Sequence, residues 1–106
     1  MMLTLMMAIA VAAPNPGSID APRKAYSACL KSFETKSMAD KLAPAEYSEA
    51  LKSACAAEAS KLMSALIAYD VAMGTKRPAA MSNAETDLGD YRTISEERYK
   101  DMNTPQ

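Results

Sequence analysis

The chain has 106 residues, and its 12 basic and 13 acidic side chains give a formal net charge of −1. This balance provides neither the basic surface expected for nucleic acid nor a Lys- and Arg-rich helical face for anionic lipid. The length suits one small domain, and abundant Ala, Leu, Met, Lys and Glu with only three glycines predict an all-α fold.

The first residues, MMLTLMMAIAVAA, carry no charge and are apolar except for Thr4. They are too few to span a membrane, which takes about 20 apolar residues, and they end in the small-x-small pattern of a signal-peptidase site. We therefore predict a signal peptide over 1–13, cleaved after Ala12 or Ala13, which leaves no stable membrane anchor. The stretch lacks the usual basic start, so the alternative is an apolar helix that stays and packs on the core.

Residues 14–20 are rich in Pro and Gly, which favours a flexible linker before a single helical domain over 21–106. Asp20 is a good N-cap residue, and it predicts a first helix over about 21–41. Residues of one face recur there at steps of three and four, at Tyr26, Cys29, Leu30, Phe33 and Ser37. Pro44 then opens a second predicted helix, over about 45–73, which Gly74 ends.

The only cysteines of the chain, Cys29 and Cys55, are equally far from Leu42, in the break between the first two predicted helices. If these helices form an antiparallel hairpin about the break, the two side chains lie at the same height on facing helices. Export to an oxidising compartment then favours a Cys29–Cys55 disulfide, which we predict. The alternative is a pair of buried free thiols.

Ser82 and Glu85 have the spacing of a capping box, which predicts a third helix over about 83–102. The expected fold is a small three-helix domain, built on a disulfide-linked antiparallel helical hairpin and preceded by a cleavable signal peptide. The second half of the second helix is the most apolar part of the mature chain. We expect the third helix to fold back over it.

The sequence offers little catalytic chemistry. It contains no histidine, which removes the usual general base, most zinc sites and most nucleophile triads. It also has no Gly-rich phosphate loop and no Ser-x-x-Lys pair. We therefore predict no enzyme, no cofactor and no metal site. Asp70 interrupts an apolar run and would suit a functional carboxylate, but an exposed edge position or an ion pair is the simpler interpretation.

These features predict a small periplasmic or secreted protein that binds another protein or itself. The candidate interaction surface consists of Leu66, Ile67, Tyr69, Asp70, Met73 and Tyr91. The alternative function is a small-molecule binder, with an apolar pocket between the second and third helices lined by Leu66, Tyr69, Asp70 and Tyr91.

Overall fold

The computed structural model describes residues 17–103, and every regular element in this part of the chain is an α-helix. The helices are α1 (Gly17–Ala39), α2 (Pro44–Leu51), α3 (Ala56–Ala72) and α4 (Arg77–Asn103). The predicted all-α fold is therefore confirmed for the described residues. The predicted leader and the first three residues of the predicted linker lie outside them.

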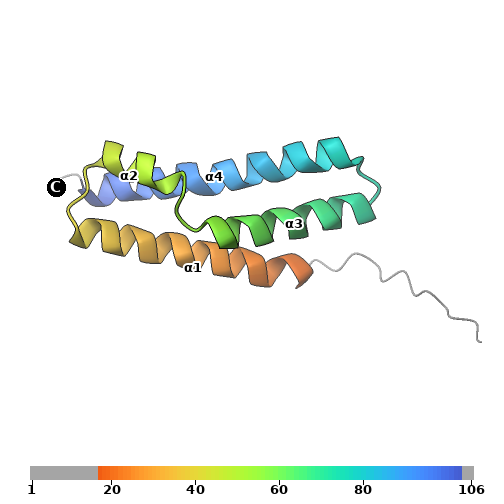
Figure 1. The fold of residues 1–106 in the computed structure, drawn as a ribbon, viewed down its shortest axis with the longest axis horizontal. Helices are drawn as coiled ribbons and strands as arrows, with labels where there is room; N and C mark the ends of the chain where they lie inside the picture. The colour runs from red at the N-terminus through yellow and green to blue at the C-terminus, as the bar shows by residue number, and fades with distance from the viewer. Residues whose placement is uncertain (1–16, 104–106) are drawn as a thin grey trace, which may run out of the picture.

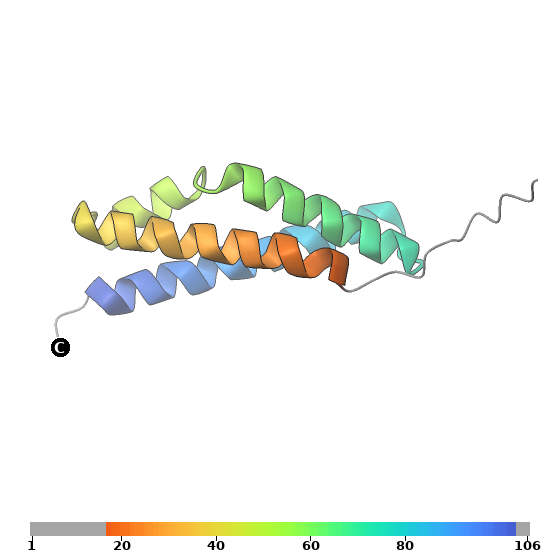
Figure 2. The ribbon, with the colours of Figure 1, turned by 90° about the horizontal axis from the view of Figure 1, so that it is seen from below.

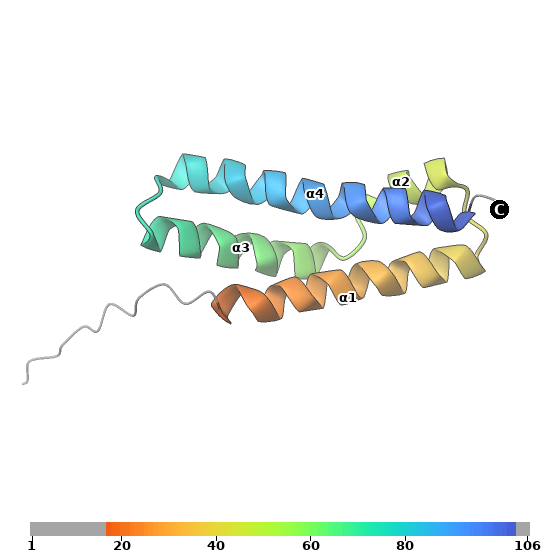
Figure 3. The same ribbon diagram turned by 180° about the vertical axis from the view of Figure 1, so that it is seen from behind.

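The helices form an elongated bundle with three passes along its length (Figure 1). α1 makes the first pass, α2 and α3 together return in the opposite direction, and α4 runs parallel to α1. Seen from below, α4 crosses obliquely behind α1 (Figure 2). Seen from behind, α3 lies along the N-terminal half of α4 and α2 along its C-terminal half (Figure 3). Each pass of the bundle packs against the other two, and the second pass is interrupted between α2 and α3.

Helix α1 begins earlier than predicted, since residues 17–20 are helical and do not form a linker. The reason is Ile19, which is only 8% exposed and belongs to the hydrophobic core. Burial of an aliphatic side chain of this size contributes about 1.5–3 kcal/mol, which favours a helix that extends beyond Pro22 toward the N-terminus.

Helix α1 also ends before the predicted residue 41. The amide of Leu42 donates to the Ser37 carbonyl at 3.0 Å, and the amide of Lys41 donates to the Met38 carbonyl at 3.1 Å. These bonds form a Schellman motif with Lys41 in the left-handed region, at φ 58°. Gly74 ends α3 in the same way, at φ 99°, as the sequence predicts.

The predicted second helix is not continuous. Residues 52–55 form a turn that separates α2 from α3, so the chain has four helices in its described part where three are expected. The predicted helix start at Pro44 is confirmed, and the Glu46 carboxylate accepts a hydrogen bond from the Ala43 amide at 3.0 Å.

Helix α4 begins at Arg77, six residues before the predicted start. The capping-box prediction at Ser82 is wrong, because Ser82 lies inside the helix and its carbonyl accepts a hydrogen bond from the Thr86 hydroxyl. Pro78 takes the second helical position, where its missing N–H leaves no hydrogen bond unmade. The two alanines that follow are strong helix formers and continue the helix.

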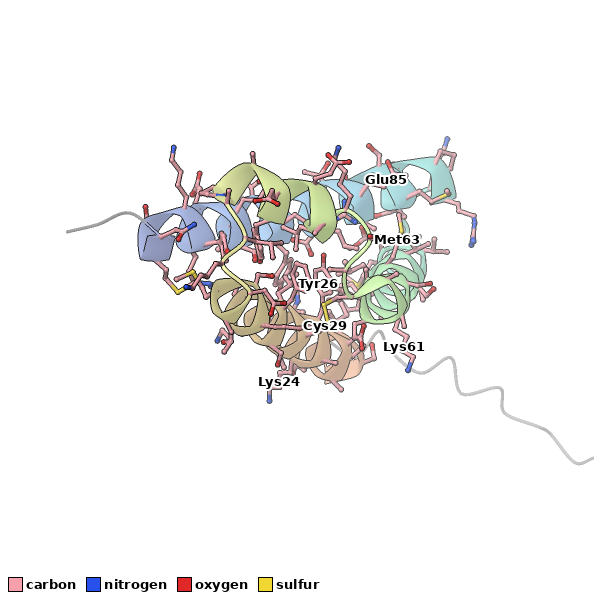
Figure 4. The ribbon with its side chains drawn as sticks, turned by 60° about the vertical axis from the view of Figure 1, so that its left-hand side comes forward. Lys24, Tyr26, Cys29, Lys61, Met63 and Glu85 are labelled. Carbon is pink, nitrogen blue, oxygen red and sulfur yellow. A yellow bond between two sulfur atoms is a disulfide. The ribbon has the colours of Figure 1, made fainter. Side chains whose placement is uncertain are left out.

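The predicted disulfide is present, and it joins α1 to the residue before α3. The Cα atoms of Cys29 and Cys55 are 5.9 Å apart. In Figure 4, Tyr26 and Cys29 lie on the inner side of α1, whereas Lys24 points away from the bundle. Closing a loop of this length stabilises the fold by about 3–4 kcal/mol in the chain-entropy approximation.

The core is unusually rich in tyrosine. Tyr26, Tyr47 and Tyr99 are at most 1% exposed, together with Leu30, Leu51 and Leu62. The rings of Tyr47 and Tyr99 stack with centroids 3.9 Å apart, and Phe33 stacks on Tyr47 at 5.3 Å. These rings hold α2 between α1 and α4. No helix of the described chain is both long and apolar enough to cross a membrane.

Candidate functional site

The structure divides the predicted interaction surface between the core and the solvent. Leu66 and Tyr69 pack against the core and are half-buried, so the chain itself covers part of the expected surface. Tyr91 of α4 is also half-buried, with its ring 5.6 Å from Tyr26 in an edge-to-face arrangement. Ile67 and Asp70 are half-buried, whereas Met73 is 61% exposed.

The apolar residues left open to solvent concentrate at the turn between α3 and α4. Val71 and Met73 near the end of α3 are 42% and 61% exposed, and Met81 in the second turn of α4 is 41% exposed. We call these three residues the tip patch. The exposed side chains of Lys76 and Arg77 lie in the same turn. Arg77 and Met81 also line an open depression of about 380 Å³.

A second depression, of about 250 Å³, lies where α1, α3 and α4 meet. Its walls are Arg23, Leu66, Asp70, Asn83, Ala84 and Asp87. It includes two of the predicted pocket residues, Leu66 and Asp70, but it is mostly polar and does not include Tyr69 or Tyr91. This depression does not have the predicted apolar lining, because α1 and α4 contribute charged and amide side chains that the pattern of the second helix could not reveal.

Arg23 connects the wall of this depression to α4. Its Nη2 atom is 3.3 Å from the Asp87 carboxylate, and its Nη1 atom donates to the Tyr91 hydroxyl at 2.8 Å. The hydrogen bond to Tyr91 is the main cause that raises the pKa of Arg23. Asp70 accepts a long hydrogen bond, 3.5 Å, from the Asn83 amide. The depression thus offers one guanidinium and two carboxylates, all of them engaged at least in part.

A buried polar cluster at the other end of the bundle escaped the sequence analysis. Glu34 of α1 is 3% exposed, and its carboxylate accepts two 2.6 Å hydrogen bonds from Arg98 of α4. Ser95 is fully buried and donates to the same carboxylate at 2.9 Å. Because the proton of Ser95 serves Glu34, the Tyr47 hydroxyl is the donor in its 2.5 Å bond to Ser95. The cluster joins α1, α2 and α4.

The spacing of residues along α1 indicates that Glu34 lies on the buried face of the helix. The buried row of α1 contains Tyr26, Leu30 and Glu34, at steps of four residues. A charged side chain in such a row is read as exposed unless its partner is known. That partner, Arg98, is 64 residues away in the chain. In the inner row of α4, Ser95 is buried beside Glu34, whereas the neighbouring Ile94 is 56% exposed.

The buried groups of this cluster are inaccessible to a substrate and engaged in hydrogen bonds with one another. The Ser95 hydroxyl has no exposed surface from which to attack a substrate, and both carboxylate oxygens of Glu34 accept hydrogen bonds from Arg98 or Ser95. Burial is the main cause that raises the pKa of Tyr47. An open depression of about 400 Å³ lies beside the cluster, lined by Lys31, Glu34, Thr35, Met38, Arg98 and Met102.

Cys29, Cys55 and Glu58 are the residues of the described chain whose ligand atoms come close enough together to hold a metal ion. The two sulfur atoms are bonded to each other, and a disulfide lacks the thiolate charge that binds metal. The three residues are therefore close enough for a metal site, but in the oxidised protein the two sulfur atoms are not metal ligands.

Comparison of the chain with protein-family models, with curated proteins and with solved structures finds no match.

We predict that the pair Glu34–Arg98 stabilises the fold. Arg98→Met leaves the buried carboxylate with Ser95 as its partner and should lower the free energy of unfolding by about 2–4 kcal/mol. The value falls short of that for a fully buried pair because the Arg98 side chain is 40% exposed. Urea unfolding measures the change.

Lys52→Met is the matched control, because it breaks the Lys52–Glu49 pair, whose side chains are 72% and 76% exposed. It should change stability by no more than about 0.5 kcal/mol. Adding Glu34→Leu to Arg98→Met should recover part of the loss, since no charge is then buried alone. An Arg98→Met variant as stable as Lys52→Met would contradict a structural role for the pair.

Tyr47 should make stability depend on pH in the alkaline range. Its pKa is raised in the folded protein, so its contribution to stability is complete below the unfolded value of about 10 and is lost as pH rises through the folded value. Tyr47→Phe removes this titration, and its stability should decline less steeply above about pH 10 than that of the wild type. Urea unfolding across this range gives both curves, and parallel curves would refute the assignment.

Proposed function

We propose that this protein is a small exported module, periplasmic or secreted, that binds another protein or a second copy of itself and catalyses no reaction. The tip patch of Val71, Met73 and Met81 is the observation that supports binding. Three large apolar side chains on either side of one turn are exposed by 41–61%. Methionine side chains adapt to the shape of a partner, which suits them to such surfaces.

Packing and charge both favour the tip patch over the rest of the predicted interaction surface. Leu66 and Tyr69 already pack against the core, so their contribution to a partner is small. Lys76 and Arg77 are exposed beside the patch, where cations add long-range attraction for an acidic partner surface. A contact of this kind would have an apolar centre and a charged rim, as protein interfaces commonly do.

Export is supported by two independent features. The apolar run over 1–13 ends in Ala10-Val11-Ala12, which has the form of a signal-peptidase site. The Cys29–Cys55 disulfide is the form that cysteines take in oxidising compartments. Each feature alone has another explanation, but together they favour a protein that leaves the cytoplasm and is processed after Ala12 or Ala13.

The role of the tip patch predicts the behaviour of a double variant, Met73→Gln with Met81→Gln. The wild type at micromolar concentration should self-associate or bind a hydrophobic dye, and the double variant should lose at least half of that signal. Its stability should stay within about 0.5 kcal/mol of the wild type, because both side chains are exposed. Light scattering and dye fluorescence measure these effects.

Met102→Gln provides the control, since Met102 is 48% exposed at the opposite end of α4 and receives the same substitution. It should leave both signals unchanged. A wild type that is purely monomeric and binds no dye would argue against the tip patch as an interaction surface. An equal loss in the control would do the same.

Export is tested by the intact mass of the protein from exported and whole-cell fractions. The exported form should begin at Ala13 or Pro14, weigh two hydrogens less than the reduced chain, and resist alkylation until it is reduced. A full-length mass with two alkylatable thiols would mean that the leader stays on the protein and that the chain is not processed for export.

Binding of a small molecule is the second candidate function, supported by the depression of about 250 Å³ at Asp70 and Asn83. Its mixed charges favour a small zwitterion over the apolar ligand first expected. Amide shifts confined to the residues around this depression, in a titration with amino acids, would support it. Shifts absent at millimolar ligand would exclude it.

A further inference from the structure

The interruption between α2 and α3 is not explained by its own sequence. Residues 52–55 read Lys-Ser-Ala-Cys and contain neither Gly nor Pro. The amides of Lys52 and Ser53 nevertheless reach back only three residues, with bonds of 3.3 Å to the carbonyls of Glu49 and Ala50. A continuous α-helix would make shorter bonds four residues back. The local sequence therefore offers no Gly or Pro to account for the turn, which directs attention to contacts from other parts of the chain.

Cys55 carries the conformation that interrupts the helix. Its φ and ψ are 58° and 32°, in the left-handed region, and it is the only residue of the turn with a positive φ. A side chain with a Cβ atom is unfavourable in this region. Cys55 is the N-cap of α3 but makes no side-chain capping bond. Its sulfur is bonded to Cys29 of α1. This bond ties the residue covalently to a neighbouring helix.

The inner faces of α2 and α3 would still agree in one continuous helix. At about 100° per residue, Tyr47, Leu51, Ala59 and Leu62 fall within about 120° of one another around a common axis. All four are buried in the bridged protein, between 0% and 9% exposed. A joined helix therefore keeps these side chains on one face, toward α1 and α4.

We propose that the Cys29–Cys55 bridge is a redox-dependent conformational switch, and that its reduction joins α2 and α3 into one helix. A dithiol reductant supplies two electrons and two protons. The bond between the two sulfur atoms breaks, two thiols form, and the reductant becomes a disulfide. Cys55 is then free to leave the left-handed region. This inference does not depend on the proposed binding function or on the tip patch.

The switch would reshape one end of the molecule and leave the other unchanged. α2 lies along the C-terminal half of α4, and α3 along the N-terminal half (Figure 3). Aligning the two helices on one axis must move α2 relative to α4, whereas the α3–α4 turn need not move. The reduced and oxidised forms would thus present different surfaces around α2.

The first test compares the oxidised and reduced full-length protein by NMR, with a chelator present so that no metal bridges the two thiols. Reduction should shift the Cα resonances of residues 52–55 to helical values. It should also slow amide exchange in this segment at least tenfold. A turn that keeps its chemical shifts after reduction, or a segment that becomes disordered, would overturn the proposal.

Two double variants give an independent test, because the two outcomes predict opposite orders of stability for them. Cys29→Ser with Cys55→Ala and Cys29→Ser with Cys55→Gly both remove the bridge. If residue 55 becomes helical, the Ala variant should have an unfolding equilibrium constant about fivefold smaller than the Gly variant. If the left-handed turn persists without the bridge, Gly is favoured there and the order reverses, which refutes the proposal.

Loss of the bridge will weaken the fold, so both variants should also be compared in sucrose, which favours compact states. A chain that stays unfolded in sucrose without the bridge would refute the proposal too, since the proposal requires a folded reduced form.

Discussion

The Cys29–Cys55 bridge is the constraint on which the arrangement of the helices depends. It fixes the middle of α1 to the first residue before α3, and it does so at the point where the middle pass of the bundle is interrupted. A domain of this size has only a modest core, so one cross-link is a substantial part of its stability. The same cross-link lies at the junction between α2 and α3.

Two guanidinium groups hold α1 and α4 together on either side of the bridge, in a reciprocal arrangement. Toward the start of α1, Arg23 reaches across to Asp87 and Tyr91 of α4. Toward its end, Glu34 receives Arg98 from α4. The first cluster is half-exposed, whereas in the second Glu34 and Ser95 are buried and only Arg98 is in part exposed. Polar contacts of this kind specify the pairing of two helices whose apolar stripes are thin.

The distribution of buried polar and exposed apolar side chains bears on the function of the protein. Glu34 and Ser95 carry functional groups of the kind that enzymes use, but both are buried and hydrogen-bonded to each other. The solvent-exposed surface at the α3–α4 turn is apolar and flanked by two basic residues. This arrangement is the basis of our proposal that the protein binds another macromolecule. The bridge adds a second property, because it couples the shape of the α2 end to the oxidation state.

Local chemistry was enough to predict the all-α fold, the helix start at Pro44, the stop at Gly74 and the pairing of the cysteines. Each of these depends on residues close in the sequence or, for the cysteines, on two positions symmetric about one break. Local chemistry also misled in one case. The Ser82 and Glu85 spacing is a valid helix start, but Pro78 and the alanines after it begin α4 earlier.

Only the tertiary structure decided the rest. The turn over 52–55 contains neither Gly nor Pro, and its last residue, Cys55, is bonded to a residue of another helix. The burial of Glu34 and Ser95 became visible only when Arg98 and Tyr47 were placed around them. The exposed tip patch emerged because Leu66 and Tyr69 pack against the core, whereas Met73 stays exposed. The sequence by itself therefore determined where helices can form and which cysteines can meet, because both follow from local spacing. Which polar groups are buried and which apolar groups stay exposed depends on contacts between residues far apart in the chain, and only the packed structure supplies these.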